Sequence, residues 1–142
     1  MLLIIARTYE NQKNHIEQQL VENYRQNVEK AIEYIDNNYM DKITIKQVCG
    51  IALMSHTYFS FIFKQIKGKT CIQYINEKRI DLAIQLLENS KKRICEISYE
   101  TGFNDTAYFN KVFLRHNGLT PREYRMLLQG RGKLAINTEN RK

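Results

Sequence analysis

Residues 55–70 of the chain read SHTYFSFIFKQIKGKT, and residues 105–120 read DTAYFNKVFLRHNGLT. At an offset of 50 positions, the two stretches share a pair of aromatic residues, a further phenylalanine, a glycine and a threonine. The matching pairs are Tyr58 and Tyr108, Phe59 and Phe109, Phe63 and Phe113, Gly68 and Gly118, and Thr70 and Thr120. So close a match within 142 residues predicts that one structural unit occurs twice.

Each stretch has the signals of one amphipathic helix. Ser55 and Asp105 are good N-cap residues, and Gly68 and Gly118 suit the left-handed position that ends a helix. Between these ends, apolar side chains recur every three or four residues, which places them on one inward face. These inward residues are Phe59, Ile62, Phe63 and Ile66 in the first copy and Phe109, Val112 and Phe113 in the second.

A shorter helix is predicted before each of these two. The pair Thr44 and Gln47 forms a capping box that begins a helix reaching about Leu53. Its second copy contains Ile94, Ile97 and Ser98, which follow Ile45, Val48 and Cys49 at an offset of 49. A short helix, a tight turn and a longer helix form a helix-turn-helix, whose second helix offers its outer face to a groove of DNA.

The rest of the chain is also predicted to be helical. Residues 12–39 read as an amphipathic helix with a possible break near Asn23, and residues 70–88 read as one long helix that begins with a capping box. On the long helix, the apolar residues are Ile72, Ile75, Leu82, Ala83 and Leu86. A last helix follows the capping box of Thr120 and Glu123 and is expected to end near Leu128.

The sequence therefore predicts an all-α fold with about seven helices: two helix-turn-helix subdomains joined by a long linker helix and preceded by an N-terminal amphipathic helix. Residues 25–129 are expected to form this double helix-turn-helix domain. Residues 1–24 are expected to form a separate N-terminal segment or linker helix, and MLLIIARTYE is either the remnant of a preceding sensory or receiver domain or the start of a short protein. Residues 130–142 are expected to be a basic, disordered tail.

The charge of the chain favours a polyanionic partner. Its formal net charge is +7, and residues 25–129 carry +5 of it. No apolar run is long enough to span a membrane, so a cytoplasmic protein without a membrane partner is expected. The three cysteines are odd in number and form no close pair, so no disulfide framework, metal site or cofactor is predicted.

An enzyme is not predicted, because the chain has neither a glycine-rich phosphate loop nor residues spaced as metal ligands. The histidines His15, His56 and His116 have no nucleophile or carboxylate arranged around them in the sequence. The alternative from another class is a protein interaction module, with Phe61, Leu114 and the helix before Tyr39 as an apolar docking surface. RNA binding is disfavoured, because no aromatic-rich strand platform is visible.

The outer faces of the two longer helices follow from the helical wheel. We expect the DNA-binding residues to be His56, Thr57, Ser60, Phe61 and Lys64 in the first copy and Thr106, Ala107, Asn110, Lys111 and Arg115 in the second. Asn110 suits adenine, Lys111 suits guanine, and Ala107 or the Thr106 methyl group suits the thymine methyl group. The competing interpretation is that these are ordinary solvated side chains.

Two copies in one chain allow a monomer to read two grooves. The 19-residue linker helix would be about 28 Å long, and successive major grooves on one face of DNA lie about 34 Å apart. We therefore expect one chain to place two recognition helices in successive major grooves of double-stranded DNA without dimerising, while the oligomeric state itself is left open.

The chain resembles the DNA-binding domain of the AraC/XylS family of bacterial transcription regulators over about residues 27–128. The resemblance is carried by ITIKQVCGIALMSHTYFSFIFKQIKGKTCIQYINEKRIDLAIQLL, by ICEISYETGFNDTAYFNKVFLRHNGLTPREYR, and most specifically by its last 24 residues. It is closest to the response-regulator members, in which a receiver domain comes first. The resemblance implies seven helices, base contacts at the helix positions above, operator DNA as partner, and RNA polymerase as a possible further partner.

The chain departs from the family pattern at two positions. Leu114 stands where the family often has the lysine that Lys64 retains, so a phosphate contact there is in doubt. Phe61 stands on the outer face, where a polar side chain would be expected, and it could pack on thymine methyl groups or on a neighbouring side chain. On the linker helix, Arg79 resembles a family arginine that helps to hold the subdomains together, and its alternative role is a snorkelling surface side chain.

Overall fold

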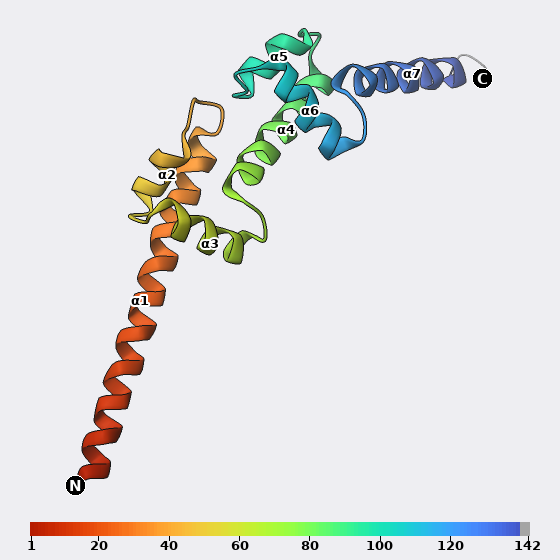
Figure 1. Ribbon diagram of the computed structural model, residues 1–142. Coiled ribbons are helices and arrows are strands. Elements are labelled where there is room, and N and C mark those ends of the chain that lie inside the picture. The colour runs from red at the N-terminus through yellow and green to blue at the C-terminus, as the bar shows by residue number, and fades with distance from the viewer. Residues whose placement is uncertain (140–142) are drawn as a thin grey trace. The chain divides into compact units, whose positions relative to one another are not determined.

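The computed structural model describes residues 1–139, with side chains described through residue 131 (Figure 1). This part of the chain contains seven α-helices and no strand: α1 (Leu2–Asn38), α2 (Ile45–Ile51), α3 (His56–Lys67), α4 (Cys71–Asn89), α5 (Ile94–Glu100), α6 (Thr106–Asn117) and α7 (Pro121–Glu139). The predicted all-α class is confirmed, and the two helix-turn-helix pairs are α2–α3 and α5–α6. Within these residues, every helix is too short or too polar to cross a lipid bilayer.

The chain forms two compact units. The first contains Met1–Asn37 and Thr44–Thr70, and the second contains Asn38–Ile43 and the chain from Cys71 onward. The short segment Asn38–Ile43, which begins with the last residue of α1, thus packs with the second unit although it precedes α2 in sequence. The division expected at residues 24 and 130 rests on composition and stays a prediction.

The helix α1 is longer than predicted and has no break. It runs for 37 residues, whereas the sequence pattern indicated a helix over 12–39 with an interruption near Asn23. Residues 2–38 contain neither proline nor glycine, and an asparagine inside a helix costs less than about 1 kcal/mol relative to alanine. A single asparagine is therefore too weak a signal to end a helix.

The last helix also continues beyond its predicted end at Leu128. α7 extends to Glu139, so the helix end expected near Leu128 is wrong, while the expectation of a disordered tail over residues 130–142 stays a prediction. Residues 140–142 lie outside the described part of the chain. Gly130 weakens a helix by about 1 kcal/mol, but it does not take the left-handed conformation that would end one. No proline follows Pro121, so nothing in the sequence forces the helix to stop.

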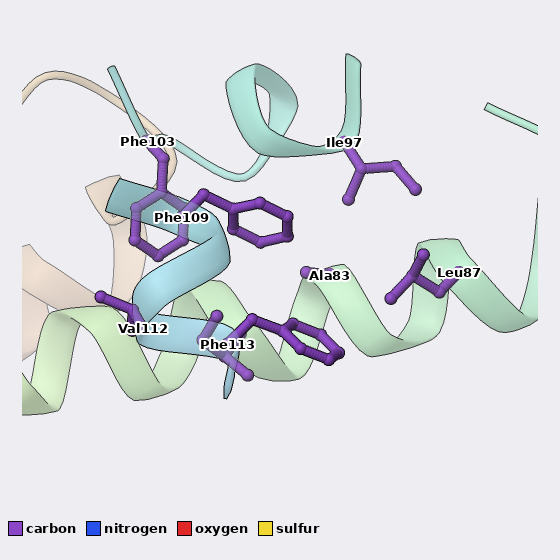
Figure 2. Packing of buried hydrophobic residues seen from close by; sticks show 8 residues of the cluster. Ala83, Leu87, Ile97, Phe103, Phe109, Val112 and Phe113 are labelled. Atoms are coloured by element: carbon purple, nitrogen blue, oxygen red, sulfur yellow. The ribbon is translucent and has the colours of Figure 1, made fainter. Parts of the chain in front are cut away.

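The core of the second unit lies between α4, α5 and α6 (Figure 2). Its aromatic rings form a chain, with centroids 5.2 Å apart for Phe103 and Phe109 and 5.8 Å apart for Phe109 and Phe113. The face of α4 that enters this core was only partly predicted. Ile80 and Leu87 are buried there, whereas Leu82 and Leu86 are half-buried and Ile72 is exposed. Apolar residues cover most of the circumference of α4, so their spacing could not select one face.

The core of the first unit is smaller. Its buried side chains come from the last third of α1, from the short helix α2 and its C-cap, and from α3: Val28, Ala31, Ile35, Val48, Cys49, Ala52, Phe59 and Phe63. Ile66 was expected to face inward but is exposed. The helix α2 has seven residues and α3 has twelve, so α2 is too short to cover the last turn of α3.

The predicted helix ends are confirmed at several positions. Thr44 and Gln47 form the reciprocal capping box of α2, and Thr120 and Glu123 make the same bonds at the start of α7. Ser55 accepts a hydrogen bond from the Tyr58 amide at the start of α3, and Asp105 accepts one from the Ala107 amide at the start of α6. Gly68 and Gly118 both have left-handed backbone angles, with φ of 70° and 71°. These ends fix the lengths of α3 and α6.

Candidate nucleic-acid interface

The two turns that orient α3 and α6 share one backbone geometry. In each, the residue after the C-cap has positive φ, namely 54° for Leu53 and 101° for Gly102. The amide of the next residue then donates to a carbonyl five residues earlier: Met54 to Cys49, and Phe103 to Ser98, both at 3.1 Å. The repeat seen in the sequence is therefore also a repeat of the turn. Leucine pays a steric cost at positive φ, whereas glycine does not.

Gly102 is required for packing as well as for φ. A Cβ atom at this position would lie 2.7 Å from the carbonyl oxygen of Tyr39, 2.9 Å from that of Met40 and 2.8 Å from Nε of Arg79. Two of these atoms belong to the backbone and cannot rotate away. The second turn thus packs directly against the segment Asn38–Ile43.

Arg79 holds the same segment from α4. Its Nε donates to the Tyr39 carbonyl at 2.7 Å, its Nη2 donates to the Asp41 carbonyl at 3.1 Å, and its guanidinium carbon lies 5.6 Å from the Phe103 ring centroid. Burial disfavours the charged guanidinium and lowers the pKa of Arg79 from its ordinary value. The alternative of a snorkelling surface side chain is wrong. The family role in holding subdomains together stays an implication of the resemblance.

All five predicted residues of α3 are exposed: His56, Thr57, Ser60, Phe61 and Lys64. Phe61 has 61% of its surface exposed, although it is a large apolar side chain in the middle of the helix. This aromatic ring is exposed to water on an otherwise polar face. Covering the ring with a partner would lower the free energy of the complex. Its exposure is compatible both with thymine methyl groups and with a protein partner.

The predicted face of α6 is only partly exposed. Ala107, Lys111 and Arg115 are exposed, whereas Thr106 and Asn110 are half-buried. The Oδ1 atom of Asn110 is buried and has no hydrogen-bond partner within the described chain. Asn110 was placed on the outer face by the helical wheel, but its side chain is partly covered. It lies one turn from the buried Phe113, at the edge of the packed face.

The cations of both faces have no partners within the described residues. Lys64, Lys111 and Arg115 form no ion pair with any described residue, in contrast to Lys92, which pairs with Glu100 at 2.7 Å, and Arg93, which pairs with Glu96 at 3.2 Å. Lys64 and Arg115 stand in the last turns of their helices, where the helix dipole favours positive charge. Three cations are thus free to contact an anion.

Two tyrosines support the N-terminal ends of these helices, a role that sequence reasoning missed. Tyr58 packs edge-on against Tyr24 of α1, with ring centroids 5.4 Å apart. Tyr108, its counterpart, lies 6.0 Å from Phe103, and its hydroxyl accepts a hydrogen bond of 2.9 Å from Nδ2 of Asn76 on α4. The repetition of Tyr58 and Tyr108 was a signal, but two of their partners, Tyr24 and Asn76, lie 34 and 32 residues away in sequence.

Arg125 makes a structural contact that the sequence did not single out. From α7, its Nη1 atom donates to the carbonyl oxygen of Lys92 at 2.5 Å, and its Nη2 atom is buried without a partner in the described chain. The bond ties α7 to the loop that leads into α5. Arg125 therefore helps to set where the second helix-turn-helix begins.

No group of three or more histidine, cysteine, aspartate or glutamate side chains within the described residues could hold a metal ion. The polar side chains of the two faces are hydroxyls, an amide, an imidazole and cations. These groups donate or accept hydrogen bonds and neutralise phosphates. The two faces can therefore bind an anionic partner through hydrogen bonds and charge.

Comparison with known proteins places these two helix pairs in one family. The family model of a helix-turn-helix domain matches residues 48–126. The regulatory protein PocR of Salmonella typhimurium is 35% identical over 98 residues, which cover 69% of this chain and 32% of PocR. The chain thus spans about a third of the length of that curated relative.

Solved structures match the same region. The C-terminal domain of the two-component response regulator yesN from Fusobacterium nucleatum is 30% identical, with a TM-score of 0.65 over 68% of this chain and 95% of that domain. The DNA-binding domain of AdpA, solved in complex with a target DNA, aligns with a TM-score of 0.69 over 74% of this chain and 95% of that domain. At 22% identity, the likeness to AdpA shows the shared fold.

Proposed function

The chain belongs to the AraC/XylS family of helix-turn-helix transcription regulators, and we propose that it binds double-stranded DNA in a sequence-specific manner and regulates transcription in the cytoplasm. In this proposal, α3 and α6 are the two recognition helices. The observation that carries it is the repeated pair of outer helix faces, each positioned by the same turn and each bearing at least one exposed cation without an ion-pair partner among the described residues.

Base readout would come from a small set of side chains. Lys111 is exposed and long enough to donate to the acceptors of guanine, and Ala107 is small enough to pack on a thymine methyl group. Asn110 is half-buried, so its amide would reach an adenine only at a close approach of α6 to the base edges. On α3, Ser60 and His56 are exposed donors and acceptors, and Phe61 offers an apolar surface.

Reading two grooves from one chain is a further part of the proposal. It rests on the unbroken 19-residue helix α4, which is about 28 Å long. The preferred site should then be asymmetric, about 17–20 base pairs long, with two groups of specified bases about one helical turn apart. Replacement of Leu82 by proline should cost the helix about 3 kcal/mol or more and uncouple the two groups.

The first experiment is a titration of a duplex with the full chain at increasing salt concentration. If six to ten phosphates are neutralised, log K should fall with log salt with a slope of about −5 to −9. A slope near zero would remove the proposal. Selection of bound sequences from a random duplex library would then identify the site, and in vitro transcription with purified RNA polymerase would test the second partner.

A protein interaction module is the alternative, because Phe61 and Leu114 are 61% and 45% exposed on the outer faces of α3 and α6. Apolar side chains at these positions would suit a protein surface as well as a base edge. The two possibilities separate in the variants Phe61→Ser and Lys111→Ala. If the surface binds DNA, Lys111→Ala should weaken duplex binding. If it is a protein docking surface, Lys111→Ala should have no effect, and Phe61→Ser should weaken binding to the protein partner.

A further inference from the structure

The hydroxyl group of Tyr108 has a hydrogen that no described residue accepts. Tyr108 lies in the first turn of α6, and 44% of its surface is exposed. Its oxygen accepts the 2.9 Å hydrogen bond from Nδ2 of Asn76, and this bond does not use the hydroxyl's own hydrogen. The side chain therefore combines a fixed oxygen with an unused donor.

The surroundings of the oxygen determine where this donor points. Asn76 and Arg79 stand three residues apart on α4 and so lie on one side of that helix. Asn76 is only 8% exposed, so packing holds its amide in place. Burial lowers the pKa of Arg79 and the nearby Tyr108 phenol acts in the opposite direction, which means that the phenol oxygen faces the cation. An amide donor and a cation both attract the oxygen lone pairs, so the hydrogen points away from α4.

Tyr108 also stands in line with two cations along one edge of the outer face of α6. Tyr108, Lys111 and Arg115 are three and four residues apart, so they fall within a sector of about 60° and span about 10 Å along the helix. All three are exposed. A hydroxyl, an ammonium and a guanidinium group thus form one row of hydrogen-bond donors.

We propose that Tyr108 donates this hydrogen to a phosphate oxygen of the DNA backbone, with Asn76 as its positioning residue. The inference rests on the proposed function and adds a contact to it. A helix in the major groove presents the middle of its outer face to the bases and its edges to the flanking backbone, and tyrosine is among the side chains that bind phosphates.

The bond to Asn76 favours a phosphate over a base. Turning the Tyr108 side chain toward the middle of the outer face would break this bond and leave a buried amide without its partner. Accepting the bond also makes the hydroxyl a stronger donor, which suits a charged acceptor. Tyr58, the counterpart on α3, packs its ring on Tyr24, and no described residue hydrogen-bonds its hydroxyl. The oriented contact is therefore expected at α6 alone.

The test is a titration of the full chain with two duplexes of equal length, one selected from the random library and one of random sequence. Tyr108→Phe should weaken binding to both by the same factor of about ten, because a phosphate carries no sequence information. The slope of log K against log salt should not change, since the tyrosine is neutral. Arg115→Ala, on the same edge, should instead make the slope shallower by about 1.

Replacing one phosphate at a time by an uncharged methylphosphonate locates the contact. At one position, the replacement should weaken binding of the wild-type chain about tenfold more than binding of Tyr108→Phe. Asn76→Ala should give a smaller uniform loss and keep the sensitivity at that position. The matched control is Tyr124→Phe, which removes a hydroxyl whose hydrogen already goes to Glu88, and it should bind as the wild type does.

The outcomes separate this inference from the proposed function. A wild-type chain that binds neither duplex would overturn both. Three results would overturn the phosphate contact alone: unchanged affinity of Tyr108→Phe, a loss confined to one base pair, or a loss that leaves the sensitivity to every methylphosphonate as in the wild type. The last result is the one expected if Tyr108 only stabilises the fold.

Discussion

The two helix-turn-helix pairs have the same plan, but the second is built into a larger packed structure than the first. Both begin with a seven-residue helix, turn through a residue with positive φ and end a twelve-residue helix at a left-handed glycine. The first turn contains an exposed leucine, whereas the second contains a glycine packed against two backbone carbonyls. The atoms packed around each turn, rather than the repeat itself, therefore decide which side chains a turn position can accommodate.

The two proposed recognition helices, α3 and α6, differ in the same way. The predicted face of α3 is exposed at all five positions, while two of the five on α6 are half-buried. The second unit also has the aromatic chain of Phe103, Phe109 and Phe113 and the ties made by Arg79 and Arg125. We expect α6 to be the more rigid reader and α3 the more adaptable one.

Truncation of a core aromatic should give the largest effect. Phe113→Ala removes a ring that is fully buried and packs on Phe109 and Tyr124, and should cost about 3–5 kcal/mol of unfolding free energy. Phe63→Ala should destabilise the first unit through the same mechanism. Hydrogen exchange should show each loss of protection concentrated in its own unit. Equal loss in both units would mean that the chain unfolds as one cooperative body.

Exchanging the turn residues tests the contrast directly. Gly102→Ala combines positive φ with contacts under 3.0 Å to backbone oxygens, and should destabilise the second unit by about 1–3 kcal/mol or more. Leu53→Gly should instead stabilise the first unit by up to about 1 kcal/mol. It removes the backbone strain of a leucine with positive φ, and the lost side chain is 79% exposed. Denaturant unfolding of each variant provides the measurement, and the expected signs are opposite.

Alanine substitutions on the outer faces should affect base preference more than folding. Lys111→Ala should reduce discrimination at one or two base pairs by about 1–3 kcal/mol with little change in melting temperature. Asn110→Ala should lose discrimination at a neighbouring base pair, with a larger effect on stability than Lys111→Ala because Asn110 is half-buried. Ser60→Ala is the matched change on α3. Full base preference in all three variants would place the DNA-binding face elsewhere.

Acid should weaken the second unit selectively, and this is the smallest effect. Hydrogen bonds from Arg93 and Thr120 lower the pKa of Glu96 and Glu123 below the ordinary value of 4.5. The stabilisation from these two carboxylates is therefore complete above pH 4.5 and is lost as the pH falls through the lowered pKa values. The corresponding cap of α2 uses the neutral Gln47. Glu96→Gln with Glu123→Gln should remove the difference in acid sensitivity between the two units, measured by hydrogen exchange.

Local signals in the sequence predicted most of the secondary structure of the two pairs. Thr44, Ser55, Asp105 and Thr120 cap helices through bonds that span two or three residues, so the sequence alone contains both partners. Gly68 and Gly118 end α3 and α6 for the same local reason. The two ends of the chain were predicted less well, because long helices such as α1 and α7 continue wherever no proline or capping glycine stops them.

The sequence by itself determined that a helix-turn-helix occurs twice, because helix periods, caps and the repeat are all short-range patterns. Only the tertiary structure decided which face of α4 is buried, that Asn110 is half-covered, and that Gly102 must lack a side chain. It also revealed the bonds from Arg79 to the carbonyls of Tyr39 and Asp41, and from Arg125 to that of Lys92. These contacts join residues 33 or more positions apart, and helical periodicity contains no information about which distant backbone atom a side chain will meet.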